Sequence, residues 1–181
     1  MSRLVLFCVV NFLSSALRGF KPDVVAYTSI IKGLCDAGSV EEAFKFFNEM
    51  LCQGPESQPD IVTYNILINA LCNQGSVSQA IDLLNRMLDH GCNPSKGTCN
   101  IFLRALREKI DPPQDGTDFL DEMVARLVKR QRISGVNEIV EVMLRKFLSP
   151  KVSTWARVIQ GLCKPKKIQA AIDKCKANLY G

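Results

Sequence analysis

The segment Val24-Val25-Ala26-Tyr27-Thr28 recurs 37 positions later in the chain as Ile61-Val62-Thr63-Tyr64-Asn65. At the same offset, Leu34-Cys35 recurs as Leu71-Cys72. Self-similarity at a fixed period of roughly 20–50 residues is typical of repeat proteins, in which each unit stacks on its neighbours. We therefore interpret this chain of 181 residues as a short array of repeats.

Each repeat is predicted to contain two helices. The first helix has apolar residues at positions i, i+3, i+4 and i+7, which form one stripe on a helix. Five segments share this template: Tyr27, Ile30, Ile31, Leu34; Tyr64, Leu67, Ile68, Leu71; Cys99, Phe102, Leu103, Leu106; Leu120, Met123, Val124, Leu127; and Trp155, Val158, Ile159, Leu162. We expect these residues, Trp155 included, to lie in the core.

The second helices have stripes of their own, which are Val40, Ala43, Phe47, Met50; Val77, Ala80, Leu84, Met87; and Ile133, Val136, Val140, Met143. Gly38 and Gly75 are expected to form the tight turns that precede two of them. The spacings Ser39-x-x-Glu42 and Ser76-x-x-Gln79 predict capping boxes, in which each side chain bonds a free backbone N–H.

These patterns predict an all-α fold, a right-handed α-α superhelix (solenoid) of antiparallel two-helix repeats. The expected units are residues 24–60, 61–95, a degenerate unit 96–116 with a Pro-rich loop, 117–151, and a partial C-terminal capping repeat 152–181. The degenerate unit has a clear first helix and then the loop Asp111–Gly116. In an alternative interpretation, Thr117–Arg130 is its second helix and the later units are shifted.

Residues 1–23 are a presequence or the remnant of a preceding repeat. Met1–Phe20 contains Arg3, Arg18 and no acidic residue, and its apolar run Leu4–Leu13 fits either an organellar presequence or a secretory signal. Arg18–Asp23 also matches the tail of a repeat. The apolar run is too short for a membrane span, so no stable membrane insertion is expected.

The charges of the chain are unevenly distributed. The net charge is +5, but residues 1–95 hold 6 Lys/Arg and 9 Asp/Glu, whereas residues 96–181 hold 17 and 9. A basic C-terminal half suits a polyanionic partner, and it equally suits a merely solvated surface.

No pattern for catalysis or for a metal site is evident. The eight cysteines include no CxxC pair, and the single histidine, His90, is followed by Gly91-Cys92, so a zinc site is not expected. His90 is expected to contact carbonyl groups at a helix end. The cysteines are interpreted as buried structural thiols, which implies a reducing compartment. We expect neither a cofactor nor enzymatic activity.

The combination of Val62-Thr63-Tyr64-Asn65, Gly33-Leu34-Cys35, Glu49-Met50 and Pro59-Asp60 resembles the plant-type pentatricopeptide repeat of the pure 35-residue class. The chain looks like a short or truncated C-terminal portion of such a protein. The resemblance implies binding of single-stranded RNA, about one base per intact repeat, in organellar RNA processing, stability or translation. It implies a mitochondrial location, with the chloroplast as the alternative, or the cytoplasm if the N-terminus is a truncation; RNA-processing proteins are further expected partners.

The resemblance also implies which residues meet the RNA. In each repeat, the residue after the aromatic of the first helix and the last residue of the repeat face the base edge. Here these are a first specificity pair, Thr28 and Asp60, and a second specificity pair, Asn65 and Ser95. Family experience links the first with guanine and the second with cytosine. Helix caps and solvent-facing polar residues are the alternative interpretation of these four residues.

Two other groups of residues follow from the resemblance. Val25 and Val62 would sandwich a base, whereas Gly97 would leave one wall missing. The lysine that family members often direct at phosphate is absent from the first two repeats, where Asp36 and Asn73 stand. It is present in the later repeats as Lys129 and Lys164, which would contact phosphate. Two alternatives remain open: a protein-binding helical scaffold similar to tetratricopeptide repeats, and a truncated product with little affinity for RNA.

Overall fold

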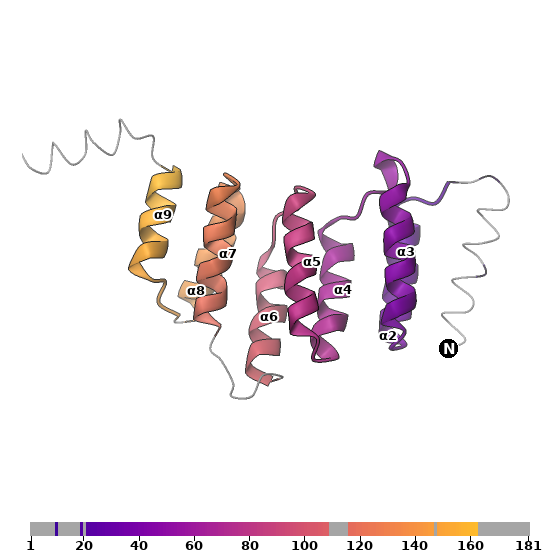
Figure 1. Ribbon diagram of the computed structural model, residues 1–181, viewed down its shortest axis with the longest axis horizontal. Helices are drawn as coiled ribbons and strands as arrows, with labels where there is room; N and C mark the ends of the chain where they lie inside the picture. Colours follow the sequence, from indigo (N-terminus) through magenta and orange to yellow (C-terminus); the bar gives the residue numbers. More distant parts are fainter. Residues whose placement is uncertain (1–9, 11–18, 20, 109–115, 147, 163–181) are drawn as a thin grey trace, which may run out of the picture. The chain divides into compact units, whose positions relative to one another are not determined.

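The computed structural model describes residues 10, 19, 21–108, 116–146 and 148–162 (Figure 1). Every regular element in these residues is helical. The chain divides into two compact units, Met1–Asp115 and Gly116–Gly181, and each is considered by itself. The predicted all-α class is confirmed within both.

The described residues of the first unit form two helical hairpins and one further first helix. Its elements are α2 (Val24–Asp36), α3 (Val40–Cys52), the 3-10 turn η1 (Pro55–Ser57), α4 (Ile61–Asn73), α5 (Val77–Asp89) and α6 (Lys96–Glu108). Helices α2 and α4 each pack along the helix that follows them. The first helices α2, α4 and α6 also pack directly on one another, so they form one continuous layer.

The second unit contains α7 (Thr117–Lys129), α8 (Ile133–Arg145) and α9 (Val152–Leu162). Helix α7 packs along α8 and also against α9, as α2 packs against α3 and α4. By this packing α7 is the first helix of a repeat rather than the second. Only eight positions separate Glu108 from Thr117, which is too few for another helix of 13 residues.

Two glycines close the hairpins as predicted. Gly38 and Gly75 both have φ +79°, in the left-handed region that glycine adopts without a steric penalty. The next backbone N–H then reaches back into the first helix, Ser39 to the Leu34 carbonyl and Ser76 to the Leu71 carbonyl, both at 2.9 Å. These bonds satisfy carbonyl groups at the helix ends.

The predicted capping boxes are wrong. Ser39 and Ser76 are the N-cap residues of α3 and α5, but neither side chain makes a capping hydrogen bond. Their ψ values are 60° and 56°, whereas the extended N-cap residue Asp23 has ψ 178°. With these ψ values the two serines are not in the extended conformation in which an N-cap side chain faces the helix, so the capping bond does not form.

Hydrophobic stripes account for most of the core. The stripes predicted for α2, α4, α6 and α7 are all buried. In the stripe predicted for α8, Val136 and Met143 are buried and Val140 is only half-buried, so the predicted position of Val140 is wrong. Ile139 and Val142 are buried as well, and the side chain of Ile133 lies outside the described residues. Trp155 is 38% exposed and Ile159 is 50% exposed, which contradicts the core interpretation of these two residues. Helix α9 instead buries Thr154 and Val158, which lie one turn apart on the face toward its neighbours.

Candidate nucleic-acid interface

Two aspartates mark the N-terminal ends of the first helices. Asp23 caps α2 by accepting a hydrogen bond from the Ala26 backbone N–H at 2.8 Å. Asp60 caps α4 by accepting one from the Thr63 backbone N–H at 2.9 Å. In both cases the carboxylate compensates an N–H that has no partner within the helix, and its charge complements the helix dipole. Asp60 therefore has a structural role in addition to the one expected at the base edge.

A buried threonine connects the two members of the first specificity pair. The Thr63 hydroxyl lies 2.7 Å from the Thr28 hydroxyl and donates to Asp60 Oδ1 at 2.9 Å. Thr63 is 0% exposed, whereas Thr28 is half-buried and Asp60 is exposed. The stacking of α2 on α4 thus brings Thr28 and Asp60 to one site at the end of the first-helix layer.

The second specificity pair has the same construction. The hydroxyl of Thr98, which is also 0% exposed, donates to the Asn65 amide oxygen at 2.7 Å. Thr98 Oγ1 lies 3.4 Å from Ser95 Oγ and accepts the Ser95 backbone N–H at 3.1 Å. Asn65 and Ser95 are therefore brought together by the stacking of α4 on α6.

The second unit contains a related arrangement that faces inward. Thr154 is 1% exposed and donates to Asp121 Oδ1 at 2.6 Å, and the Lys151 backbone N–H lies 3.4 Å from both Asp121 oxygens. Asp121 itself is buried, and the Lys151 ammonium pairs with Asp118 at 2.7 Å. The Asp121 carboxylate thus already accepts hydrogen bonds from within the second unit. Asp121 and Lys151 therefore do not offer the open polar edge that the specificity pairs offer in the first unit.

The residues expected to flank a base are apolar and exposed. Val25 is 66% exposed and Val62 is 52% exposed, each at the start of a first helix. Gly97 occupies the corresponding position in α6, and a Cβ added to it would lie 3.3 Å from Ser95 Oγ. The backbone of Gly97 therefore lies close to the second specificity pair, but it provides no apolar side chain to flank a base.

Cations missed by the sequence analysis lie on the first-helix layer. Lys32 pairs with Asp36 at 2.6 Å, and Arg104 donates to the amide oxygens of Asn69 at 2.5 Å and Asn73 at 3.4 Å. Lys32 and Arg104 are exposed. Lys32, Asn69 and Asn73 also line an open depression of about 390 Å³ between α2 and α4. The repeat offset would have revealed these cations, because Lys32 and Arg104 both occupy the ninth position of their first helix.

The sequence predicts two lysines that contact phosphate. Lys129 is exposed at the last turn of α7, in the second unit. Lys164 lies outside the described residues.

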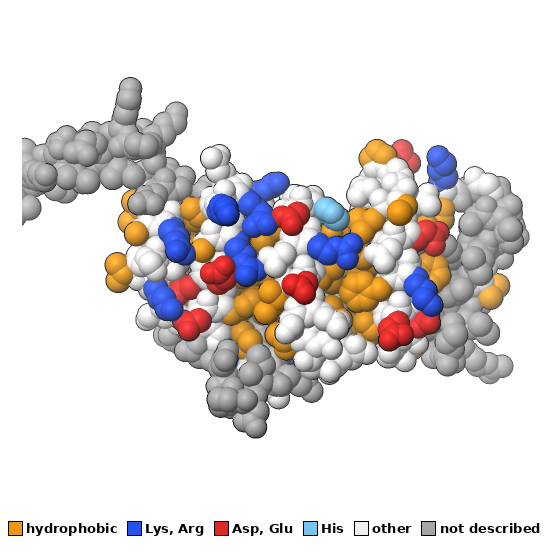
Figure 2. Space-filling model, viewed as in Figure 1, with side chains coloured by type: hydrophobic (Ala, Val, Ile, Leu, Met, Phe, Trp, Pro, Cys, Tyr) orange, Lys and Arg blue, Asp and Glu red, His pale blue; other side chains and the backbone are white. Residues whose placement is uncertain are grey.

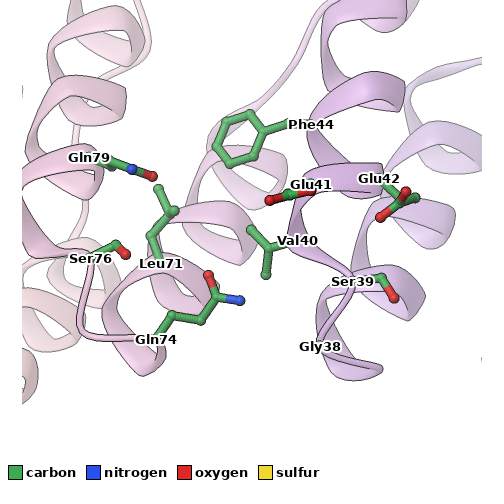
Figure 3. A pocket seen from close by; sticks show the side chains of 10 residues that line it. All are labelled: Gly38, Ser39, Val40, Glu41, Glu42, Phe44, Leu71, Gln74, Ser76 and Gln79. Atoms are coloured by element: carbon green, nitrogen blue, oxygen red, sulfur yellow. The ribbon is translucent and has the colours of Figure 1, made fainter.

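Other surfaces of the first unit have a different chemical character. A depression of about 360 Å³ lies between the start of α3 and the α4–α5 turn. Its lining includes the carboxylates Glu41 and Glu42 and the amides Gln74 and Gln79 (Figure 3). Acidic side chains repel phosphate, so this depression is unsuited to RNA. A shallow groove lies between α3 and α5, where hydrophobic side chains are visible in Figure 2. It is lined by Phe44, Gln79, Asp82, Leu83 and Arg86, of which Leu83 is buried and Phe44 half-buried.

In each of the two hairpins of the first unit, one buried tyrosine of the first helix bonds a residue of the second helix or of its C-cap. The Tyr27 hydroxyl donates to Glu49 at 2.8 Å, and burial, with a further contribution from Glu49, raises the pKa of Tyr27 above its ordinary value. The Tyr64 hydroxyl bonds Nδ1 of His90, and burial raises the pKa of Tyr64 to about 12. The expectation that the His90 side chain contacts helix-end carbonyls is therefore wrong, because Tyr64 lies within its reach.

The described cysteines Cys35, Cys52, Cys72, Cys92 and Cys99 are free thiols. Burial raises the pKa of Cys35 and of Cys72 to about 11, so both remain protonated near neutral pH. No group of three His, Cys, Asp or Glu side chains suited to a metal ion occurs among the described residues. Within the same residues, no helix is both long enough and apolar enough to cross a membrane.

Sequence comparisons identify the repeats. A model of the PPR repeat family matches residues 59–108, and a PPR repeat model matches residues 18–51. The chain is 63% identical over 132 residues to Pentatricopeptide repeat-containing protein At4g20090 of Arabidopsis thaliana. This match covers 72% of the chain but only 20% of the relative.

Structural comparison points to the same fold. The crystal structure of the pentatricopeptide repeat protein PPR10 in complex with an 18-nt psaJ RNA element matches with a TM-score of 0.50 and 24% identity, over 95% of this chain and 22% of that one. The structure of PPR10 from maize matches with a TM-score of 0.44 and 23% identity, over 96% of this chain and 23% of that one. The chain thus spans about a fifth of the length of the relatives that it matches.

Proposed function

The chain belongs to the pentatricopeptide repeat family, and on that basis we propose that it binds single-stranded RNA through the N-terminal ends of its first helices. The observation that carries this proposal is the pairing of Thr28 with Asp60 and of Asn65 with Ser95 through buried hydroxyl groups. Each pair offers open polar groups beside an exposed helix start. Unpaired bases present their Watson–Crick edges to such groups.

The neighbouring side chains fit the same ligand. Val25 and Val62 are exposed apolar groups on successive first helices, and they can flank an unstacked base. Lys32 and Arg104 add positive charge to the same layer of helices, where a phosphate backbone would run. RNA is also the ligand in the PPR10 complex.

The proposed mode of action is recognition without catalysis. With two open specificity pairs, about one base each, the described residues would select too few bases to choose a single transcript. We propose that this part of the protein contributes to recognition in organellar RNA processing, stability or translation. Localisation of a fluorescent fusion in plant cells tests the mitochondrial, chloroplast and cytoplasmic alternatives.

Binding to short single-stranded RNA pools at two salt concentrations tests the proposed function. We expect affinity that falls as salt rises, because cations on the protein replace counterions on the phosphates. Thr28→Asn should then shift the preference at one nucleotide from guanine toward uracil, because the new amide can donate to a uracil carbonyl. Binding that is absent at both salt concentrations would contradict the proposal.

A protein-binding scaffold is the second candidate function. The groove between α3 and α5 favours it, since the half-buried ring of Phe44 lies there beside the exposed side chain of Arg86. This surface is formed by the second helices, whereas the specificity pairs lie on the first helices. Substitution of Phe44 by Ser should therefore weaken a protein partner without changing RNA affinity.

A further inference from the structure

We propose that Thr63 and Thr98 are positioning residues that set which atoms of each specificity pair donate and which accept hydrogen bonds. The inference rests on the proposed function, because it concerns how the pairs distinguish one base from another. It adds two residues that lie behind the RNA-facing surface and touch no base themselves.

The first pair becomes an all-acceptor site. A hydroxyl group has one proton, and Thr63 donates it to Asp60 Oδ1, since a carboxylate only accepts. In the 2.7 Å contact between Thr63 and Thr28, the donor must therefore be Thr28. With its proton engaged, Thr28 offers only lone pairs to a ligand, as does the exposed carboxylate of Asp60.

An all-acceptor site selects guanine. The Watson–Crick edge of guanine carries two adjacent donors, N1–H and the N2 amino group. Adenine places its acceptor N1 beside its amino group, and uracil flanks N3–H with two carbonyl groups. Adenine or uracil would therefore place an acceptor against an oxygen of Thr28 or Asp60. Two acceptors cannot form a hydrogen bond, and a desolvated polar group without a partner costs binding energy. The hydrogen-bond directions thus favour guanine independently of any code.

The second pair acquires a donor. The Thr98 hydroxyl donates to the Asn65 amide oxygen at 2.7 Å, which fixes the orientation of the amide and leaves Nδ2, a donor, beside Gly97. A fixed N–H donor matches N3 of cytosine, which is an acceptor, and opposes N3 of uracil, which carries a proton. Thr98 thus favours cytosine over uracil.

Burial makes this assignment firm. Thr63 and Thr98 are each 0% exposed, so water does not compete for their hydroxyl groups. The third example, Thr154 with Asp121, has the same geometry in the second unit. In all three cases the threonine follows the first position of its repeat by two residues and bonds to the first helix of the preceding repeat.

Valine and serine substitutions in the full chain test the proposal. Valine has the shape of threonine without the hydroxyl, whereas serine keeps the hydroxyl. Binding is measured against short oligouridine RNAs in which two adjacent nucleotides take every combination of bases. Thr63→Val should lower the preference for guanine over adenine by about tenfold, because the released Thr28 proton can now bond adenine N1. Thr63→Ser should retain it.

Thr98 provides the matched control. Thr98→Val should reduce the preference for cytosine over uracil at the neighbouring nucleotide and leave guanine selection unchanged, whereas Thr63→Val should do the reverse. A general loss of folding would instead lower affinity for every RNA equally, and thermal unfolding of each variant measures it.

The outcomes separate the two levels of the hypothesis. If the unaltered chain binds RNA with these preferences and Thr63→Val retains them, the positioning role is overturned and the proposed function stands. Equal weakening toward all RNAs in a Thr63→Val variant whose thermal unfolding is unchanged would also overturn the positioning role. If the unaltered chain shows no salt-dependent binding to any of the RNAs, both proposals fail.

Discussion

The guanidinium of Arg104, on α6, donates to the amide oxygen of Asn69, on α4, at 2.5 Å. The two residues lie 35 positions apart and meet because the first helices of successive repeats pack on one another. A second donation from the same guanidinium reaches the amide oxygen of Asn73 at 3.4 Å. Because a guanidinium carries five donors, others remain for the phosphate contact that we propose.

Removing this cation should change the salt dependence of RNA binding. For Arg104→Gln we expect the slope of log affinity against log salt to fall by about 0.7, the contribution of one phosphate contact on a single strand. Lys32→Gln should have a similar effect. Lys45→Gln, on α3, is the matched control, because it removes one exposed charge from a second helix. An equal change in the control would indicate net charge alone.

Substitutions at Asp60 should separate capping from recognition. Asp60→Ala removes the cap of α4 and should lower the free energy of unfolding by about 1 kcal/mol, measured by urea denaturation. Asp60→Asn can still accept the Thr63 N–H, so stability should stay close to the original. Its amide group would, however, place a donor against guanine N1–H.

Asp23 provides the control for the two substitutions at Asp60, because it caps α2 with the same geometry. Asp23→Ala should cost similar stability without changing base preference at the first specificity pair. If Asp60→Asn keeps the guanine preference, the carboxylate is not part of the recognition site.

The burial of Tyr64 should make stability sensitive to alkaline pH. The pKa of Tyr64 is raised from 10.0 to about 12 in the folded state, mainly by burial. Such a group stabilises the fold fully below its unfolded pKa of 10.0, and this contribution is lost as pH rises through about 12. Urea unfolding at several pH values should show a smaller loss over this range in Tyr64→Phe than in the original chain.

At neutral pH the same substitution should cost about 1 kcal/mol, the usual contribution of one hydrogen bond. A parallel pH dependence in both proteins between about 10 and 12 would show that Tyr64 is not the group responsible.

The thiols should differ in their rates of alkylation. Cys72 is 1% exposed and its pKa is raised to about 11, so at pH 8 its thiolate is scarce in the folded state. Cys52 is exposed and serves as the internal control. Site-resolved mass spectrometry after iodoacetamide treatment should show Cys52 modified at least about tenfold faster than Cys72. Equal rates in native protein would contradict the buried position of Cys72, and equal rates in urea are expected.

The sequence by itself determined the repeat and the faces of most helices. The apolar spacing that begins at Tyr27, Tyr64, Cys99 and Leu120 predicts four stripes that the structure buries, because side chains three and four positions apart share one face of a helix. Gly38 and Gly75 were likewise predictable, since few residues other than glycine adopt a left-handed turn easily.

Only the tertiary structure decided which of the predicted caps and buried positions form. Ser39 and Ser76 have the capping spacing, yet their backbone is not extended and the capping bond does not form. Trp155 has the stripe spacing, yet α9 buries Thr154 and Val158 instead. A spacing within one helix states which residues share a face, but not what that face contacts.

The specificity pairs show the same division. Thr28, Asp60, Asn65 and Ser95 were identified as candidates from their positions in the repeat, whereas Thr63 and Thr98, which connect them, were not. These threonines bond residues 35 and 33 positions earlier, across the packing of one first helix on the next. Hydrogen-bond lengths and directions between stacked helices arise from that packing, so no pattern within a single repeat encodes them.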